Sequence, residues 1–313
     1  MEIRIGNVIE KHRITLGMTR RELSENICSE KYIYMIEKGK RRPSAFIVRM
    51  LGDKIGIDLF KYSEYVDCED PISVSSTIEK FNIYRMNNES ELLAKATLEA
   101  VKLPDFKKAP WKYEIECNKY TIKVLGKGEY RDSIKEISKI ISDIKHDSSL
   151  TICIINFYVL LSTCYHMSGD IENAKKAIFI ANGLIEKKGK IYRYVQVVVT
   201  VKICKISVHY LAGELDRVIE EGIDLVKYEE EHCFYERSHY TYFFLALSNY
   251  QRGFEEEAME WFIKALCATL IRYKPMDIFY IKKFATFDEL IKDNRIPKCL
   301  VSMFMDKYGI NSQ

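Results

Sequence analysis

Short amphipathic segments follow one another closely near the amino terminus. Apolar residues recur at helical spacing over 5–16, which predicts a first helix. Gly17 follows directly, and glycine commonly terminates a helix. Thr19 and Glu22 then stand three positions apart, which is the capping-box spacing of a helix that begins after its threonine. The pattern therefore predicts two short helices joined by a tight turn.

Three further helices are predicted in the same region. Ser29 is a natural N-cap for a third helix over 30–38, which ends at Gly39. A basic loop follows, and Ser44 caps a fourth helix behind it. A fifth helix is expected to open at 56–58. The region is thus expected to form a bundle of five short helices.

This order of helices resembles the helix-turn-helix domains of Cro and the phage repressors. The resemblance covers about residues 3–60 and depends on several motifs that occur in the correct order. The matching positions are Ile5-Gly6, the helix start over 19–23, Ile36-Glu37-Lys38-Gly39, Arg42-Pro43-Ser44, and Leu51 with Ile55-Gly56-Ile57. The resemblance implies a domain that binds double-stranded DNA with its third helix in the major groove.

The turn before the third helix indicates a narrower group. It is one residue shorter than in most phage repressors, and in this form residues 26–39 resemble the Rgg/PlcR/PrgX group of peptide-sensing transcription regulators. Members of that group carry a helical, tetratricopeptide-like domain behind the DNA-binding domain. The resemblance therefore implies an all-α protein, and it predicts that the rest of the chain is repetitive.

Four glycines mark a repeat in the rest of the chain. Gly128, Gly169, Gly213 and Gly253 lie 41, 44 and 40 residues apart, and an amphipathic segment follows each of them. Bulky and small residues recur around them where the two helices of a tetratricopeptide hairpin interlock. The copy around Gly213 is the poorest, because it places lysines at expected apolar positions. We predict an α-solenoid of helical hairpins, which exposes a long concave face.

An acidic segment over 66–74, which contains Pro71, separates the two regions. It is followed by a predicted linker helix near 75–85. The sequence thus predicts a helix-turn-helix domain over 1–65, a linker helix region over 66–87 and a repeat domain over 88–313, which binds the ligand and dimerises.

Charge is distributed unevenly along the 313 residues. The net charge is only +3, but residues 1–62 contain 13 Lys or Arg against 8 Asp or Glu, a local net charge of +5. The basic excess therefore lies at the end predicted to bind DNA. This agrees with an acidic partner there, although a solvated basic face has the same composition.

Composition and motifs argue against other classes of protein. The longest uncharged apolar run, near 150–161, is too short to cross a bilayer, and the amino terminus lacks a signal-peptide pattern, so we expect a cytoplasmic protein without membrane contact. Nine scattered cysteines without a C-x-x-C pair predict packing rather than disulfides or a zinc site. No phosphate-binding, zinc-protease or serine-hydrolase motif occurs, so we expect no enzyme, metal or cofactor.

The candidate DNA contacts lie on and around the third helix. By resemblance, the outward residues of that helix contact bases, the start of the preceding helix holds phosphate, and the basic loop forms a second phosphate clamp. The candidates are Lys31, Tyr32 and Tyr34 for bases, Thr19, Arg20, Arg21 and Ser29 at the helix starts, and Lys38, Lys40, Arg41 and Arg42 in the loop.

Several of these residues have structural alternatives. Thr19 and Ser29 suffice as helix caps, and Tyr32 is open to a packing role. Glu37 is expected to be structural and to pair with a nearby cation, because a carboxylate repels phosphate.

The candidate peptide contacts are taken from the first helix of each hairpin, which lines the concave face of a tetratricopeptide stack. Amides can bond both groups of an extended peptide backbone, and apolar residues can take its side chains. The candidates are Asn118, Asn156, Val159, Thr163, Gln196, Thr200, Ile203, Tyr240 and Phe243. The alternative is that many of them pack against neighbouring helices or a partner subunit.

Two functions remain open on the sequence. The first is a homodimeric regulator that binds a near-palindromic operator and a short, largely apolar signalling peptide. The second is an interaction scaffold whose repeats dock a protein partner, with constitutive DNA binding. The few charges among the candidate contacts favour the peptide.

Overall fold

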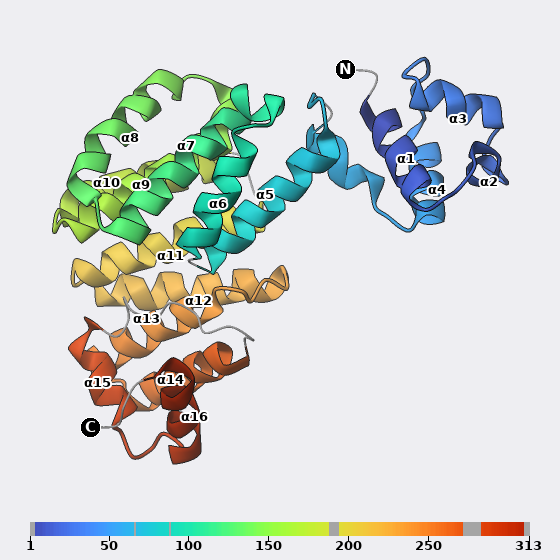
Figure 1. The fold of residues 1–313 in the computed structure, drawn as a ribbon. Helices are drawn as coiled ribbons and strands as arrows, with labels where there is room; N and C mark the ends of the chain where they lie inside the picture. The colour runs from blue at the N-terminus through green and yellow to red at the C-terminus, as the bar shows by residue number, and fades with distance from the viewer. Residues whose placement is uncertain (1–3, 66, 88, 188–193, 272–282, 310–313) are drawn as a thin grey trace. The chain divides into compact units, whose positions relative to one another are not determined.

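The protein is helical throughout the part that the structure describes (Figure 1). This computed structural model describes residues 4–65, 67–87, 89–187, 194–271 and 283–309. No strand occurs within these ranges, so the predicted all-α class is confirmed. The chain divides into two compact units, Met1–Met86 with Glu91–Ile115, and Asn87–Ser90 with Glu116–Gln313.

The first unit begins with a bundle of short helices. Its helices are α1 (Arg4–Thr15), α2 (Arg20–Ser24), α3 (Glu30–Glu37), α4 (Ala45–Ile55), the 3₁₀ helix η1 (Leu59–Tyr65), α5 (Pro71–Met86), α6 (Ser90–Ala100) and the 3₁₀ helix η2 (Pro104–Lys107). Ile9, Leu23, Ile33 and Leu51 are fully buried where α1 to α4 meet. The predicted fifth helix is present as η1, a 3₁₀ helix, after Gly56 has ended α4 in the left-handed conformation.

Helix α5 includes the predicted linker helix. Phe81 on α5 packs edge-on against Phe106 of η2, with the ring centroids 5.9 Å apart. The carboxylate of Asp105 accepts hydrogen bonds from the backbone N–H groups of Glu69 and Asp70, at 2.8 and 3.1 Å. Compact structure in the first unit thus continues beyond the bundle of α1 to α4.

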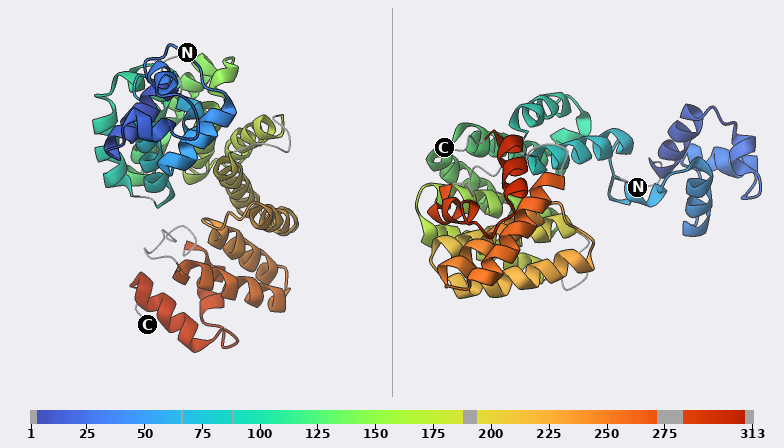
Figure 2. Two further views of the ribbon diagram at one scale, coloured as in Figure 1. Left: turned by 90° about the vertical axis from the view of Figure 1, so that its right-hand side faces the viewer. Right: turned by 90° about the horizontal axis from the view of Figure 1, so that it is seen from below.

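The second unit is a series of helical hairpins. Its elements are α7 (Trp111–Thr121), which begins in the first unit, the π-helical turn η3 (Ile122–Gly126), α8 (Tyr130–Ile144), the 3₁₀ turn η4 (Ser148–Leu150), α9 (Thr151–Met167), α10 (Ile171–Glu186), α11 (Val195–Leu211), α12 (Leu215–Glu231), α13 (Ser238–Gln251), α14 (Glu255–Ile271), α15 (Ala285–Ile291) and α16 (Lys298–Tyr308). The pairs α9/α10, α11/α12 and α13/α14 run antiparallel and follow one another through the unit (Figures 1 and 2).

The glycines that defined the repeat lie at the turns of the hairpins. Gly169, Gly213 and Gly253 have φ values of +85°, +74° and +81°, which are strained for any residue with a Cβ atom. Gly128 takes the same conformation before α8. The segments predicted to form helices after these glycines are α8, α10, α12 and α14, so the sequence register is confirmed.

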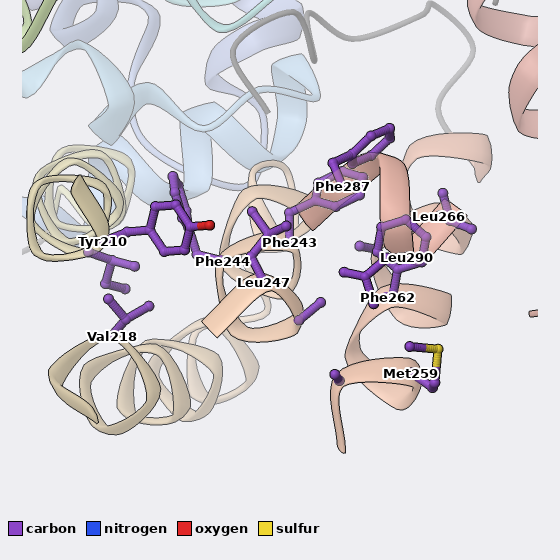
Figure 3. Close-up of a cluster of buried hydrophobic side chains, with 14 of the residues drawn as sticks. Tyr210, Val218, Phe243, Phe244, Leu247, Met259, Phe262, Leu266, Phe287 and Leu290 are labelled. Atoms are coloured by element: carbon purple, nitrogen blue, oxygen red, sulfur yellow. The ribbon is translucent and has the colours of Figure 1, made fainter. Parts of the chain in front are cut away.

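Small residues let the paired helices approach closely. Ala174 and Ala181 of α10, and Ala258 and Ala265 of α14, are completely buried. At the carboxyl end the gaps are filled by aromatic rings instead. Phe243, Phe262, Phe287 and Phe304 form a chain of ring contacts at centroid distances of 5.6–6.3 Å. The first three of these rings are labelled in Figure 3.

One helical stretch, Ser148–Met167, is long and apolar enough to cross a membrane by length and composition. Half of its most apolar window is buried inside the protein. Phe157, Leu160, Leu161 and Cys164 on this stretch are buried. Since a core helix of a soluble protein meets the same criteria, the stretch is explained by its packing against α8 and α10.

We expect Gly222→Ala to destabilise the repeat domain. A Cβ atom at Gly222 would lie 2.7 Å from Cδ2 and 3.0 Å from Cγ of Leu245, which is fully buried on α13. Overpacking of this kind costs about 1–3 kcal/mol. Urea unfolding followed by circular dichroism measures the change.

The matched control is Gly183→Ala on α10. No atom lies within 4 Å of a Cβ atom at Gly183. Alanine in a helix is favoured over glycine by about 0.5–1 kcal/mol, so this variant should equal or exceed the wild type. Equal destabilisation by both substitutions would contradict close packing at Gly222.

Candidate nucleic-acid interface and repeat-domain ligand residues

Helix α3 presents one polar face to solvent because its other face is anchored in the bundle. Ser29 caps it, since the Ser29 hydroxyl oxygen accepts the N–H of Tyr32 at 3.2 Å. Ile33 and Ile36 are buried on the inner face, whereas Lys31 and Tyr34 are exposed. The outward residues predicted from the sequence are therefore on the solvent side of the helix.

Glu37 is the electrostatic centre of the bundle. Its buried carboxylate accepts hydrogen bonds from Nε of Arg13 and from Nε of Arg20, each at 2.6 Å. Arg13 also donates to the carbonyl of Met18 at 2.7 Å. The structural role expected for Glu37 is confirmed: it ties the end of α3 to α1 and to the start of α2.

A second carboxylate holds two of the predicted phosphate contacts. Glu10 pairs with Nζ of Lys38 at 2.9 Å and with Nη2 of Arg20 at 3.2 Å. The hydrogen bond from Lys38 and the nearby arginines lower the pKa of Glu10 despite its partial burial. Without DNA, Arg20 and Lys38 therefore form ion pairs within the domain. A DNA phosphate would have to compete with Glu10 for these two side chains.

The two tyrosines on α3 have different surroundings. Tyr34 is 41% exposed, and its ring lies near two cations, with Cζ of Arg20 at 5.4 Å and Nζ of Lys40 at 5.8 Å from the ring centroid. The hydroxyl of Tyr32 donates to the carbonyl of Arg42 at 3.2 Å. Tyr32 thus connects α3 to the basic loop. This contact favours the packing role of Tyr32 over a direct contact with a base.

The remaining predicted cations are exposed to solvent. They are Arg21, Lys31, Lys40, Arg41 and Arg42. Within the described part of the chain, Arg21, Lys31 and Arg41 form no ion pair. Such charges are available to neutralise phosphates at no cost from broken contacts.

Thr19 completes the predicted capping box. Its hydroxyl oxygen accepts the N–H of Glu22 at 3.1 Å, and its own N–H donates to the Glu22 carboxylate at 2.7 Å. Thr19 and Ser29 therefore both serve as caps, as the structural alternative required, and both remain exposed.

The nine predicted peptide contacts lie on the first helices of the hairpins, α7, α9, α11 and α13, but they differ in exposure. Asn118, Ile203 and Phe243 are buried, at 0%, 7% and 0% exposure. Phe243 belongs to the aromatic core in Figure 3, and Ile203 packs into the same cluster. These two residues have the packing role that the sequence left open.

The other six predicted contacts are half-buried. They are Asn156, Val159, Thr163, Gln196, Thr200 and Tyr240. The hydroxyls of Thr163 and Thr200 donate to the carbonyls of Val159 and Gln196 within their own helices, at 3.0 and 2.8 Å. Among the described residues, the side-chain amides of Asn156 and Gln196 form no hydrogen bond. These two amides remain able to bond a peptide backbone.

The sequence analysis missed Arg237, which precedes α13. Its Nη1 lies 3.4 Å from the Thr200 hydroxyl, and its Nε is buried without a hydrogen-bond partner. Arginine at the edge of an apolar helix is common, so the sequence contained no signal that this one turns inward.

One of the lysines that weakened the repeat around Gly213, Lys205, has a structural explanation. Nζ of Lys205 pairs with Glu221 at 2.7 Å, and Nδ1 of the buried His209 lies 2.5 Å from Glu214, which also pairs with Lys175. Burial alone would raise the pKa of Glu221, but the His209 ring, with Nε2 at 3.5 Å, and the ion pair with Lys205 lower it to about 2. These contacts join α10, α11 and α12 by charge instead of apolar packing.

The pKa of Glu229 on α12 is raised, in contrast to that of Glu221. The residue is 1% exposed, and burial raises its pKa to about 7, because the nearby hydroxyls of Ser238 and Thr241 only partly offset the loss of water. The Thr241 hydroxyl donates to Oε1 of Glu229 at 3.4 Å. No group of three or more metal-ligating side chains was found in the described ranges.

We expect Glu229→Gln to change how stability depends on pH. The folded-state pKa near 7 exceeds the unfolded value of 4.5, so the wild type loses stability as the pH rises from about 4.5 to above 7. The loss reaches about 3 kcal/mol above pH 7. The variant lacks this titration, so its stability relative to the wild type should increase over the same range.

Urea unfolding at pH 4.5, 6 and 8 measures this difference. Glu230→Gln, an exposed neighbour on the same helix, is the control and should follow the wild type at each pH. A constant difference between Glu229→Gln and wild type across the range would contradict a buried acid with a raised pKa.

Comparison with known proteins agrees with this geometry. Residues 9–61 match the helix-turn-helix family model, which covers the region from α1 into η1, so the chain carries a helix-turn-helix DNA-binding domain. No curated protein sequence matches the chain.

Solved structures share the fold of almost the whole chain. Bacillus thuringiensis PlcR, in complex with the peptide PapR7 and DNA, matches with a TM-score of 0.66 at 15% identity, over 93% of this chain and 100% of PlcR. A proposed transcriptional regulator from Listeria monocytogenes EGD-e matches with a TM-score of 0.52 at 12% identity, over 99% of this chain and 100% of that protein. At such identities the likeness shows the fold alone.

Proposed function

We propose that the protein is a homodimeric transcription regulator that binds an operator through its helix-turn-helix domain and a short signalling peptide through its repeats. The match of residues 9–61 to the helix-turn-helix family carries the DNA-binding part. The repeat part is supported by the half-buried amides on α9 and α11, and by the fold shared with PlcR, which was solved with a peptide and DNA.

The exposure of the DNA-binding candidates supports separate roles for them, some at bases and others at phosphates. We assign Lys31 and Tyr34 to base edges, because both are exposed on the outer face of α3. We assign Arg21, Lys40, Arg41 and the neighbouring Arg42 to phosphates.

The remaining candidates are proposed to act from within the domain. Arg20 and Lys38 begin in ion pairs with Glu10, so we assign them to positioning Tyr34 and the end of α3 as well as to phosphate. Thr19, Ser29 and Tyr32 are assigned to holding α2, α3 and the basic loop in place, with any DNA contact secondary.

The repeat domain is proposed to hold an extended peptide along its first helices. Asn156 and Gln196 supply free amides that can bond successive backbone groups. Val159 and Tyr240 supply half-buried apolar surface for side chains. Low charge at these positions fits a peptide better than a broad charged face for docking a folded protein.

The first test is capture of genomic DNA fragments by the purified full-length protein, repeated with Arg41→Ala/Arg42→Ala. Wild type should recover a short inverted repeat with half-sites about one helical turn apart, or a multiple of it. The double variant should bind at least 10-fold more weakly at 150 mM salt. The slope of log affinity against log salt should fall by about 2, because two phosphate contacts are lost.

The control is Arg217→Ala/Lys227→Ala, which removes two exposed positive charges from α12 in the repeat domain. It should bind the operator as wild type does. If wild type recovers only salt-sensitive binding without a sequence preference, the helix-turn-helix is not an operator-reading domain. The repeats would then be better explained as a docking scaffold.

The second test measures whether a peptide changes operator affinity. Heptapeptides retained by the full-length protein from a random library are added at saturation to an operator titration. Ligands that favour one arrangement of the protein typically change affinity by about 5- to 150-fold, and we expect a change in this range. Identical titration curves with and without a retained peptide would exclude regulation by that peptide while leaving operator binding intact.

A further inference from the structure

The guanidinium of Arg237 is an incompletely satisfied charge inside the repeat domain. The residue is half-buried, and its Nε is shielded from solvent without a hydrogen-bond partner. Its contact with the Thr200 hydroxyl, at 3.4 Å, is long for a hydrogen bond. Within the described part of the chain, no carboxylate pairs with Arg237.

This state is unusual for arginine. A guanidinium carries five donors and remains charged at all physiological pH values, so buried arginines normally have a carboxylate or several carbonyl partners. Two other enclosed arginines among the described residues follow that rule: Arg13 bonds Glu37 and the carbonyl of Met18, and Arg85 pairs with Glu114. The guanidinium of Arg237 loses water on burial, and no carboxylate or set of carbonyls in the described residues compensates for that loss.

A buried acid of the same region, Glu229, does not pair with Arg237. Glu229 on α12 faces Ser238 and Thr241 of α13, and its raised pKa has no contribution from an arginine. The thiol of Cys204 on α11 does experience the positive charge of Arg237. The guanidinium is therefore directed toward α11, on the side of Thr200 and Cys204.

Arg237 also lies among the residues selected from the sequence as ligand contacts. Thr200 is its direct neighbour, and Gln196 lies one turn before Thr200 on α11. Tyr240 lies one turn after Arg237 at the start of α13, where its N–H donates to the Arg237 carbonyl at 3.0 Å. A positive charge, a hydroxyl and a free amide thus lie together at the junction of α11 and α13.

We infer that Arg237 binds a carboxylate carried by the ligand of the repeat domain, with Thr200 as the adjacent hydroxyl and Gln196 bonding the ligand backbone beside it. The inference rests on the proposed peptide-binding function and adds a chemical requirement to it. The peptide must bear a carboxylate, either at its free carboxyl terminus or on an Asp or Glu side chain. Two parallel N–H···O bonds from a guanidinium fit this group.

The test exposes the full-length protein to two random heptapeptide libraries, one with free carboxyl termini and one with amidated termini. Peptides retained only from the free-acid library identify the terminal carboxylate. Retention from both libraries with enrichment of Asp or Glu at one position identifies a side chain. For the retained peptides, Arg237→Gln should lower affinity by about 10- to 100-fold, the range of a charge-assisted hydrogen bond. Arg237→Lys should recover part of the lost affinity, because lysine keeps the positive charge but lacks the planar guanidinium that binds both carboxylate oxygens.

The matched control is Arg217→Gln, an arginine exposed on α12, which should retain the same peptides as wild type. If wild type retains neutral, amidated peptides that Arg237→Gln binds equally well, the inference is overturned and the peptide-binding function stands. If wild type retains no peptide from either library, both are overturned.

A second readout does not depend on any ligand. The Arg237 side chain makes no capping hydrogen bond to α13, so replacing it by an apolar residue removes no cap. Arg237→Met should therefore leave the melting temperature of the unliganded protein unchanged or raise it. A drop of several degrees would show that the guanidinium has a structural partner in the chain, and would overturn the inference.

Discussion

The repeat domain depends on a backbone constraint at the turn of each hairpin. Gly169, Gly213 and Gly253 take positive φ values, so each first helix ends abruptly and the next helix returns along it. Close return is possible because the second helices present alanine or glycine at the contact, as at Ala174 and Gly222. The first helices are consequently covered on one side by their partners. Half-buried positions on α9 and α11 keep two side-chain amides, those of Asn156 and Gln196, that form no hydrogen bond within the described residues.

Buried charges differ in whether the protein itself supplies their partners. The carboxylate of Glu37 pairs with two arginines, each at 2.6 Å. This network holds α1, α2 and α3 together with partners that all lie within the domain. The ion pair of Lys205 with Glu221 does the same between α11 and α12. Arg237 differs because its charge is enclosed without a comparable partner in the described residues.

The sequence predicts the parts of this structure that depend on local chemistry. The capping box at Thr19 and the glycine register of the hairpins each follow from a few neighbouring residues, and both were confirmed. The exposure of the residues proposed to contact a ligand depends instead on which side of a helix is covered by its neighbours. Helices α9 and α11 are apolar on nearly all sides, so periodicity could not separate Ile203, which packs into the core, from Asn156, which does not. The inward turn of Arg237 has no local signal for the same reason.

The rigidity of the helix-turn-helix limits how a ligand could control it. Helix α3 is fixed by its Ser29 cap, by the buried Glu37 network and by the Tyr32 contact to the basic loop. Reshaping its outer face would require breaking several of these contacts, which costs more than the few kcal/mol that a short peptide can contribute through differential binding. In the proposed dimer, control therefore has to act on the arrangement of the two DNA-binding domains. A ligand that binds one spacing of these domains better than another would select among operators without altering any residue that touches DNA.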